Sequence, residues 1–460
     1  MSRWLRIAGV VTPLALILTL VARRERRTPS PPLIPYHSAE RKLLILGAGF
    51  GGFSVAQHLA GRLPAEASVL ALDRHDFLTF WPMVPETIPA SIEVQHALRP
   101  LPAELVRRGV NFLQAEVEEV DLHARRVKTS RGEFEYDRLV IALGWETNFF
   151  GVPGAEEHGL TVQSIEDAIR IRDRVIDSLE AAAAEVQAGR RAGGCALHFA
   201  VVGGGSTGVE VAANLRELLY ILLPQYPALS SAETKVHLLQ AGDDVLPHMD
   251  QQLRRIAAAR LGSEDIEVRT DARVARVDGS GVELSDGSRV EAELVVWAAG
   301  VRSTSLVSKI KGAAADDKGR LEVDEFLRLK QRTEVYALGD VAAVSSDGKP
   351  VPPTAQATVQ EAAVVAENLL AGLSGGDLRP FTYHPMGTLV DLGSRFAVSQ
   401  VMGRRVSGRL AQMLWRGVYL YKLGDGRDRL EVMLDWLVGW LAGPRVTRLP
   451  GPHMKARKTA

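Results

Sequence analysis

Cysteine is almost absent from this chain of 460 residues, since Cys195 is the only one. This excludes a disulfide within one chain, a redox-active cysteine pair and a thiolate metal site. The sequence shows no pattern of another kind of metal site either. A single cysteine also favours a reducing compartment. Net charge is lacking as well, because Lys plus Arg and Asp plus Glu each number 55. The overall charge thus gives no reason to expect a nucleic-acid partner.

An apolar run of full membrane-spanning length is also lacking, although the N-terminus comes close to one. Residues 7–22 are uncharged, but these sixteen residues at about 1.5 Å each fall short of the ~30 Å hydrocarbon core. We interpret residues 1–27 as a hydrophobic anchor, with a cleaved signal peptide or a loosely held tail as alternatives. The basic run at 23–27 predicts an inner (cytoplasmic) membrane protein with its catalytic domains on the cytoplasmic face. Pro-rich residues 28–41 predict a stiff linker.

The first glycine-rich turn of the chain lies between a predicted strand and a predicted helix. "KLLILGAGFGG" begins as a continuous apolar run, as in a parallel strand covered on both faces. Gly47, Gly49 and Gly52 form a G-x-G-x-x-G pattern, whose backbone N–H groups bind a pyrophosphate at a helix N-terminus. A second strand, "SVLALD", ends at Asp73, 21 residues after Gly52. An acidic side chain at this point meets an adenosine ribose.

The same pattern returns in the middle of the chain. "HFAVVGGGSTGVEVAANL" is another strand, turn and helix, and its glycines are Gly203, Gly205 and Gly208. Each copy closes with a similar strand, "YDRLVIALG" in the first and "AELVVWAAG" in the second, and in both 92 residues separate the last turn glycine from the closing glycine. The turn signals "SRGE" and "SDGS" predict a short β-meander before each closing strand. The sequence therefore predicts two dinucleotide-binding domains.

A later strand, "EVYALGD", ends in the carboxylate of Asp340 and has no glycine-rich turn after it. It fits as the last strand of the first domain, reached after the second domain has been completed. The predicted fold class is therefore α/β, with two Rossmann-like dinucleotide-binding domains, the second inserted in the first, and a C-terminal amphipathic helical region. The predicted boundaries are 42–160 and 326–380 for the first domain, 161–325 for the inserted domain and 381–460 for the C-terminal region.

Together these motifs resemble the two-dinucleotide-binding-domain flavoproteins, and within them the type II NADH:quinone oxidoreductases, which are single-subunit enzymes that do not pump protons. The resemblance runs from about residue 42 to about residue 449. The glycine-rich turns, "LVIALG" and "VYALGD" are common to the superfamily. The more specific motifs are "TNFFGVPGAEEHG" (147–159), "GGGSTGVE" (203–210), "VVWAAGV" (295–301), "PPTAQATVQEA" (352–362), "SGRLAQMLWRGVYLYKL" and "DRLEVMLDWLVGWL".

The resemblance implies FAD at the first glycine turn and NADH at the second, with the flavin carrying the chemistry. Asp340 is expected at the ribityl end of FAD, with a helix cap as the alternative role. The segment "FWPMVPE" is expected beside the flavin ring. The residues assigned to FAD are Gly47, Ala48, Gly49, Phe50, Gly51, Gly52, Asp73, Arg74, Pro82, Val117, Gly144, Asp340 and Ala357. Those assigned to the nicotinamide dinucleotide are Gly203, Gly205, Ser206, Thr207, Gly208, Gln240 and Gly300.

Two residues of the inserted domain bear on how the electron donor is held and chosen. Glu210 is either a favourable carboxylate in the first helical turn or, as the resemblance implies, the acid that orients the nicotinamide. Gln240 stands where the family usually has an acidic residue for the 2′-hydroxyl of NADH. A neutral amide can bond a hydroxyl without repelling a phosphate. We therefore expect NADH as the main donor and NADPH as a second one.

Gln356 and Gln360 lie four residues apart on a predicted helix that opens with a Pro-Pro pair. As bare sequence they fit an exposed helix face, but amides at this spacing can also bond a carbonyl ligand. The resemblance places them at the pocket where a quinone meets the flavin. Thr358 replaces an alanine of the family pattern, which leaves the choice of quinone open.

The C-terminal helices are too short and too interrupted by charge to cross a bilayer, and their aromatic and basic residues suit an interface. We expect them to dock on the membrane surface. Cover for the protein's own core, or a homodimer interface, is the alternative.

The predicted function is transfer of hydride from NADH to FAD and of two electrons to a membrane quinone, without proton pumping. The alternatives are an NAD(P)H-dependent reductase of a biosynthetic quinone precursor or of a small electron-carrier protein, and a nucleotide-binding signalling protein.

Overall fold

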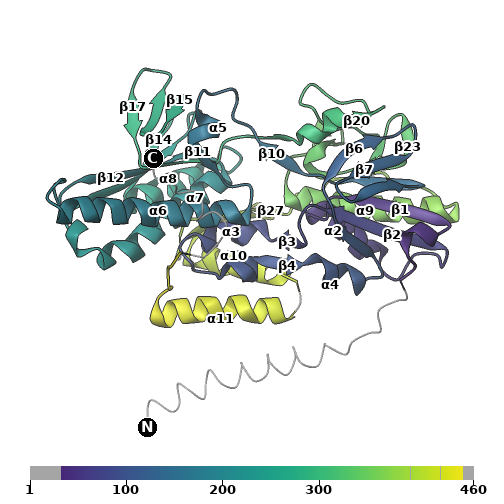
Figure 1. Cartoon of the computed structure of the whole chain (residues 1–460), viewed down its shortest axis with the longest axis horizontal. Coiled ribbons are helices and arrows are strands. Elements are labelled where there is room, and N and C mark those ends of the chain that lie inside the picture. The colour runs from purple at the N-terminus through teal and green to yellow at the C-terminus, as the bar shows by residue number, and fades with distance from the viewer. Residues whose placement is uncertain (1–32, 394, 425, 449–460) are drawn as a thin grey trace, which may run out of the picture.

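The computed structural model describes residues 33–448 with the exception of residues 394 and 425. The predicted N-terminal anchor lies outside these residues, as does part of the predicted linker. Within the described part of the chain, no helix is long and apolar enough to cross a membrane. Figure 1 shows two lobes joined side by side, with the C-terminal helices, coloured yellow, beneath the left lobe and the middle of the molecule.

The first lobe is built on a six-stranded sheet in the order β22-β23-β9-β1-β2-β5. Neighbouring strands run parallel except β22 and β23. The bounds are β1 (Arg41–Leu46), β2 (Ala67–Asp73), β5 (Asn111–Gln114), β9 (Arg138–Ile141), β22 (Arg328–Leu329) and β23 (Arg332–Ala337). Because β23 pairs with β9, the chain returns to this sheet after it has built the second one.

The second lobe repeats this arrangement with a five-stranded parallel sheet in the order β11-β18-β12-β13-β14. The bounds are β11 (Gly159–Thr161), β12 (Ala196–Val202), β13 (Glu233–Leu239), β14 (Ile266–Arg269) and β18 (Leu294–Trp297). Strand for strand it matches β23-β9-β1-β2-β5, because β1 and β12 each run into a glycine-rich turn. The two parallel sheets predicted from the repeat are confirmed.

Helices cover both sheets, and a β-meander stands beside each one, as the turn signals predict (Figure 1). The helices are α2 (Phe50–Leu59), α3 (Val84–Thr87), α4 (Leu101–Val106), α5 (Ala155–His158), α6 (Ile165–Gln187), α7 (Ser206–Leu222), α8 (Gln251–Ser263) and α9 (Ala355–Ser374). The meanders are β6 (Val117–Asp121), β7 (Arg126–Thr129), β8 (Gly132–Glu135), and β15 (Val274–Asp278), β16 (Gly281–Leu284), β17 (Arg289–Glu291). The short strands are β3 (Phe77–Thr79), β4 (Leu98–Pro100), β21 (Leu321–Glu322), β24 (Ala342–Ala343), β25 (Ser345–Ser346) and β26 (Lys349–Pro350).

The two connections between the lobes pair with each other. β10 (Trp145–Thr147), where the chain leaves the first lobe, is antiparallel to β19 (Val301–Ser303), where it comes back. Soon afterwards β20 (Ile310–Lys311) pairs with β6 of the first lobe. The return thus precedes the predicted boundary at residue 325. A two-residue strand that covers an open sheet edge has no periodicity from which a sequence prediction could find it.

The C-terminal region contains a small sheet that the sequence prediction missed. β27 (Gly387–Asp391), β28 (Ala397–Val401) and β29 (Arg404–Gly408) form an antiparallel sheet before the two helices α10 (Arg409–Lys422) and α11 (Gly426–Ala442). Trp415 on α10 and Val432 on α11 are fully buried in a core continuous with the second lobe. The region therefore packs on the body of the protein through one side of each helix.

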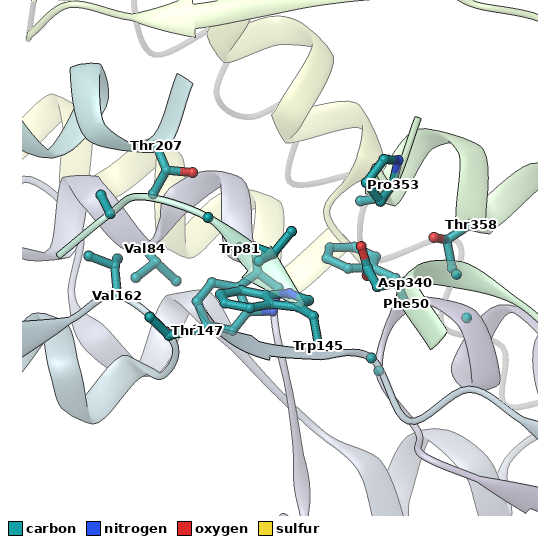
Figure 2. Close-up of a pocket in the computed structure, with 18 of the residues that line it drawn as sticks. Phe50, Trp81, Val84, Trp145, Thr147, Val162, Thr207, Asp340, Pro353 and Thr358 are labelled. Atoms are coloured by element: carbon teal, nitrogen blue, oxygen red, sulfur yellow. The ribbon is translucent and has the colours of Figure 1, made fainter. Parts of the chain in front are cut away.

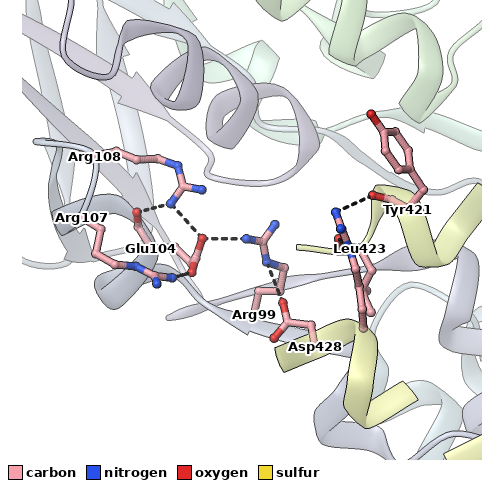
Figure 3. Close-up of polar contacts among 8 residues, drawn as sticks. Arg99, Glu104, Arg107, Arg108, Tyr421, Leu423 and Asp428 are labelled. Carbon is pink, nitrogen blue, oxygen red and sulfur yellow. Dashed lines mark hydrogen bonds and ion pairs between the residues drawn. The ribbon is translucent and has the colours of Figure 1, made fainter. Parts of the chain in front are cut away.

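The inner face of α11 is held by polar contacts with the segment between β3 and α4. Asp435 lies 2.5 Å from Nδ1 of His96, and the indole Nε1 of Trp436 donates to Glu86 at 2.8 Å. Near the start of α11, Asp428 lies 3.5 Å from Nε of Arg99. Figure 3 shows that Arg99 continues this network into the first lobe, where it bonds the carboxylate of Glu104.

Glu104 is the buried centre of that network, and its carboxylate also contacts Arg107 and Arg108. We expect Glu104→Gln to lower the free energy of unfolding by about 3 kcal/mol, because it removes the countercharge of a buried cluster. Urea denaturation measures this. The control is Glu133→Gln, which removes an ion pair about half exposed on both sides and should cost less than about 1 kcal/mol. Equal losses of unfolding free energy in the two variants would contradict the role of Glu104 as the centre of a buried charged cluster.

Candidate functional site

Two helix N-termini carry the glycine-rich turns, and neither is capped by a side chain. α2 begins after Gly49 and α7 begins after Gly205, and no cap side chain accepts a hydrogen bond from the first turn of either helix. The first backbone N–H groups of a helix need partners from outside the helix. An anion such as a pyrophosphate is the partner that both the N–H groups and the helix dipole favour.

The space around the glycines fits this role in both turns. A Cβ on Gly52 would lie 1.8 Å from the carbonyl oxygen of Gly47, and a Cβ on Gly208 would lie 1.8 Å from that of Gly203. Only glycine can close such a turn. Gly49 and Gly205, in contrast, face open space, since a Cβ added to either would have no neighbouring atom within 4 Å. The open side lets a phosphate reach the backbone, so both turns fit a dinucleotide.

Asp73 and Gln240 occupy matching places in the two lobes. Asp73 ends β2 and accepts a hydrogen bond from the backbone N–H of Ala48 at 2.7 Å. Gln240 follows β13 and accepts from the backbone N–H of Gly204 at 2.9 Å with its Oε1. Each side chain therefore braces the glycine turn of its own lobe from the end of the next strand. The two sites differ in charge, because one has a carboxylate and the other an amide.

A cavity of about 350 Å³ lies between the two turns and is lined from both lobes. Figure 2 shows Thr207 on one side of it and Asp340 with Thr358 on the other. The sequence-predicted site residues that line it are Gly49, Phe50, Gly51, Gly144, Thr207, Glu210, Gly300 and Asp340. Burial raises the pKa of the Asp340 carboxyl. The cavity is thus the place where groups bound at the two turns can meet.

Three tryptophans line this cavity that were not among the predicted site residues, although Trp81 lies in the segment expected beside the flavin ring. The rings of Trp81 and Trp145 lie 6.0 Å apart on its wall (Figure 2). Trp297, at the end of β18 in the second lobe, also lines the cavity. Trp145 directly follows Gly144, and Trp297 lies within the "VVWAAGV" motif. Their position next to predicted residues could have identified both tryptophans from the sequence. Of the segment predicted around Pro82, the residues on the wall are Trp81, Val84 and Pro85 rather than Pro82 itself.

Glu210 lines the cavity and belongs to a group of buried acids. Its Oε1 accepts a hydrogen bond from the backbone N–H of Asp391 at 3.1 Å. Burial, together with the nearby negative charge of Glu86, raises the pKa of Glu210 to about 8. Burial likewise raises the pKa of Glu86 to about 7. At neutral pH, Glu210 is therefore mostly a neutral carboxylic acid, which can donate a hydrogen bond to a carbonyl oxygen in the cavity.

The structure does not bring Gln356 and Gln360 to this cavity. Gln356 donates to the hydroxyl of Tyr383 at 2.8 Å, and Gln360 bonds both the carbonyl oxygen and the N–H of His384, at 2.9 and 3.0 Å. Both amides therefore fasten α9 to the segment before β27. The α9 residues that do line the cavity are Ala355 and Thr358. A helix turns 100° per residue, so these two lie on a different face from the glutamines.

The remaining predicted cofactor residues lie outside the cavity wall. Arg74 follows β2, Val117 starts β6, and Ala357 is buried within α9. The turn residues that are not among the lining residues belong to the two strand-to-helix junctions, and they are Gly47, Ala48, Gly52, Gly203, Gly205, Ser206 and Gly208.

Two similar lobes with uncapped glycine turns that meet at one cavity define a protein with two dinucleotide-binding domains. A family model described as pyridine nucleotide-disulphide oxidoreductase matches residues 41–362. The chain is 30% identical to the type II NADH:quinone oxidoreductase Ndh of Mycobacterium tuberculosis, over 88% of this chain and 89% of that protein. It is also 30% identical to the demethylphylloquinone reductase NdbB of a Synechocystis species, over 87% of this chain and 96% of that protein.

The fold is that of a solved relative as well. The structure of NDH2 from Plasmodium falciparum in complex with NADH superimposes with a TM-score of 0.78, at 21% identity, over 88% of this chain and 99% of that one. The chain belongs to the type II NADH:quinone oxidoreductases within the pyridine nucleotide-disulphide oxidoreductase family. The resemblance seen in the sequence motifs is confirmed.

Proposed function

We propose that this protein is an FAD-dependent oxidoreductase that takes hydride from NADH and passes two electrons to a quinone, without proton pumping. The single observation that carries this proposal is the cavity between the two glycine turns, because it gives both partners of the flavin access to one place. FAD, when bound, supplies the hydride and electron chemistry. The family relatives named as NADH:quinone oxidoreductases support the same pair of substrates.

The chain's own residues bind and orient the reactants. The turn before α2 holds the pyrophosphate of FAD, and Asp73 and Asp340 hold its ribose and ribityl ends. The turn before α7 holds the pyrophosphate of NADH. Glu210 stands at the cavity wall in its protonated form and donates a hydrogen bond to a carbonyl oxygen, first of the nicotinamide amide and then of the quinone. The three tryptophans give the cavity an aromatic wall.

The quinone-contacting role of Gln356 and Gln360 stays a prediction. Their amides are engaged by Tyr383 and His384, so a quinone could reach them only by replacing those bonds. Of the two α9 residues that line the cavity, Ala355 and Thr358, only Thr358 has a polar side chain.

A membrane quinone must be collected from a bilayer, and the C-terminal helices present a surface suited to that. Their outer sides carry exposed apolar residues, while their inner sides are packed on the protein. The members of this docking face are Leu410, Met413, Tyr421, Leu434, Leu437, Val438, Trp440 and Leu441.

A helix that points its apolar side outward gains free energy when that side enters the headgroup region. The protein therefore docks on the membrane surface through α10 and α11, on the cytoplasmic side if residues 1–27 act as an anchor. Pairing of two copies through the same face is the competing use of this surface.

Docking predicts the effect of charges placed on that face. Val438→Asp with Leu441→Asp, in a chain that lacks residues 1–32, should reduce co-sedimentation with lipid vesicles by about tenfold or more, since each carboxylate opposes burial at the interface. The control is Val106→Asp with Met402→Asp, which adds the same charges to exposed apolar positions elsewhere. If the double variant and its control co-sediment with the vesicles to the same extent, the docking face is assigned wrongly.

The amide at Gln240 predicts relaxed discrimination between the two nicotinamide donors. We expect Gln240→Glu to raise the ratio of kcat/KM for NADH over NADPH by about tenfold, because a carboxylate there repels the 2′-phosphate. Steady-state rates with each donor measure the ratio. A wild-type ratio that already strongly favours NADH, and that does not change in the variant, would contradict this role.

Turnover with defined acceptors tests the function as a whole. The purified protein should oxidise NADH rapidly with a short-tailed quinone and only slowly with a ferredoxin-type carrier. Fast turnover with the carrier alone would favour the electron-carrier reductase instead.

One observation favours a second candidate, a reductase of a biosynthetic quinone precursor. The chain is as similar to a demethylphylloquinone reductase as to a relative named type II NADH:quinone oxidoreductase, at 30% identity to each. A kcat/KM for a ring-demethylated naphthoquinone at least tenfold above that for the methylated ring would support this role.

A further inference from the structure

A second cavity, of about 830 Å³, lies between the inserted domain and the C-terminal helices. It is lined by α7 and α8 on one side and by α10 and α11 on the other. α7 lines both cavities, because Thr207 and Glu210 face the first and Arg216 and Tyr220 face the second. The second cavity is separate from the NADH and FAD turns, so the proposed redox reaction makes no use of it.

The charge of this cavity is positive. It is lined by two carboxylates, Glu217 and Glu264, and by five guanidinium groups, which belong to Arg216, Arg260, Arg395, Arg409 and Arg416. Two of the five are neutralised, since Arg216 pairs with Asp265 at 2.8 Å and Arg260 pairs with Glu264. Cationic groups gathered in one concave site attract an anion.

Of the other three guanidinium groups, those of Arg395 and Arg409 are available to a ligand. That of Arg416 also acts electrostatically on the buried carboxyl of Glu86 and keeps one N–H without a partner among the described residues. Arg395 and Arg409 are exposed and have no hydrogen bond or ion pair to any residue that the structure describes. Arg416 lies over the ring of Trp436, at 4.8 Å from the ring centroid, and its buried Nε has no hydrogen-bond partner within the described chain. A buried guanidinium N–H without a partner is costly, and a phosphate oxygen is a suitable acceptor for it.

The rim of the cavity is apolar and continuous with the docking face. Tyr220, Met413 and Trp440 line the cavity, and each remains about three-quarters exposed, at 76%, 72% and 75%. Met413 and Trp440 are also members of the docking face. A ligand with a negative head and an apolar tail would therefore place its head among the arginines and its tail along residues that face the bilayer.

We propose that this arginine cavity binds the headgroup of an anionic phospholipid when α10 and α11 rest on a membrane. This inference depends on the proposed membrane docking and adds a specific lipid class to it. Free phosphate satisfies the arginines but leaves the apolar rim uncovered, so the continuity of cavity and docking face favours the lipid. Clusters of basic side chains at a membrane interface recognise anionic headgroups in the same way.

The test uses the full chain in a neutral detergent and calorimetric titration with short-chain phosphatidylglycerol, short-chain phosphatidylcholine and inorganic phosphate. We expect saturable binding of phosphatidylglycerol, with phosphatidylcholine weaker by about tenfold and no binding of phosphate in the same range. Arg395→Gln with Arg409→Gln should weaken phosphatidylglycerol binding by about tenfold, at roughly a few-fold per charge. The control is Arg190→Gln with Arg255→Gln, which removes two exposed charges outside the cavity and should change binding less than about twofold.

Three results would overturn the lipid site. They are equal binding of the two lipids, binding of phosphate as tight as that of phosphatidylglycerol, and equal loss in the variant and its control. NADH:quinone turnover of the full chain, and vesicle sedimentation of the chain that lacks residues 1–32, separate this failure from failure of the proposed function. Without the lipid site, the protein still turns over and sediments equally with neutral and anionic vesicles. Without membrane docking, it sediments with neither.

Discussion

Glu210→Gln is expected to slow reoxidation of the reduced protein by quinone by about 10²–10³-fold, the usual loss when a positioned proton donor is removed. The amide keeps the shape of the side chain and has two N–H donors, but it cannot release a proton. Reduction by NADH should slow less than about tenfold, because hydride transfer needs orientation and no proton from this group. Anaerobic stopped-flow absorbance measures both rates separately.

The rate of quinone reduction should also depend on pH, in a direction set by the pKa of Glu210. Because the pKa of Glu210 is raised to about 8, the carboxyl is protonated below that pH and loses its proton above it. The quinone rate of the wild-type protein should therefore be flat from about pH 6 to 7 and fall as the pH rises through about 8, whereas Glu210→Gln should show no such fall. Glu86→Gln removes a negative charge that raises this pKa, so the midpoint should move to lower pH with little change in the plateau rate. A wild-type rate that rises with pH would contradict the donor role.

Gly208→Ala is expected to raise the KM for NADH by about a hundredfold, the cost of displacing a bound group by about 1 Å. The added methyl would lie 1.8 Å from the carbonyl oxygen of Gly203, so the turn must open to admit it. The first lobe is not altered, and bound FAD should stay at wild-type content. Flavin absorbance per protein and steady-state rates over a range of NADH concentrations measure the two quantities.

Two alanine variants show what the second turn does. Gly205→Ala adds a methyl that meets no protein atom within 4 Å, so it should leave stability unchanged and weaken NADH binding alone. Gly262→Ala on α8 also meets no atom, and it should change neither property. A Gly208→Ala protein with the wild-type KM for NADH would show that this turn does not hold the donor.

The parts of the fold that the sequence predicts are those encoded by local patterns. Continuous apolar strands, glycine turns at fixed spacing and paired turn signals appear twice, and together they define both sheets and both meanders. The return of the chain to the first sheet at β23 is also visible, because a strand ending in Asp340 without a glycine turn needs a partner elsewhere. Each of these features lies within a few consecutive residues.

The parts that the sequence does not predict depend on partners far apart in the chain. The contact of Trp436 with Glu86 joins residues separated by 350 positions, and nothing near either residue marks it. Gln356 and Gln360 have the expected spacing on α9, but only the fold shows that Tyr383 and His384 engage their amides. The raised pKa of Glu210 likewise follows from burial beside Glu86, which lies in a distant part of the chain.

The measurement that tests the central claim most directly is an anaerobic two-step reduction. The purified protein in detergent is mixed with one equivalent of NADH, and then with a short-tailed quinone. Bleaching of the flavin absorbance by NADH, followed by fast recovery when the quinone is added, is the predicted result. Bleaching without recovery would contradict quinone reduction at this cavity and leave a flavin reductase with a different acceptor.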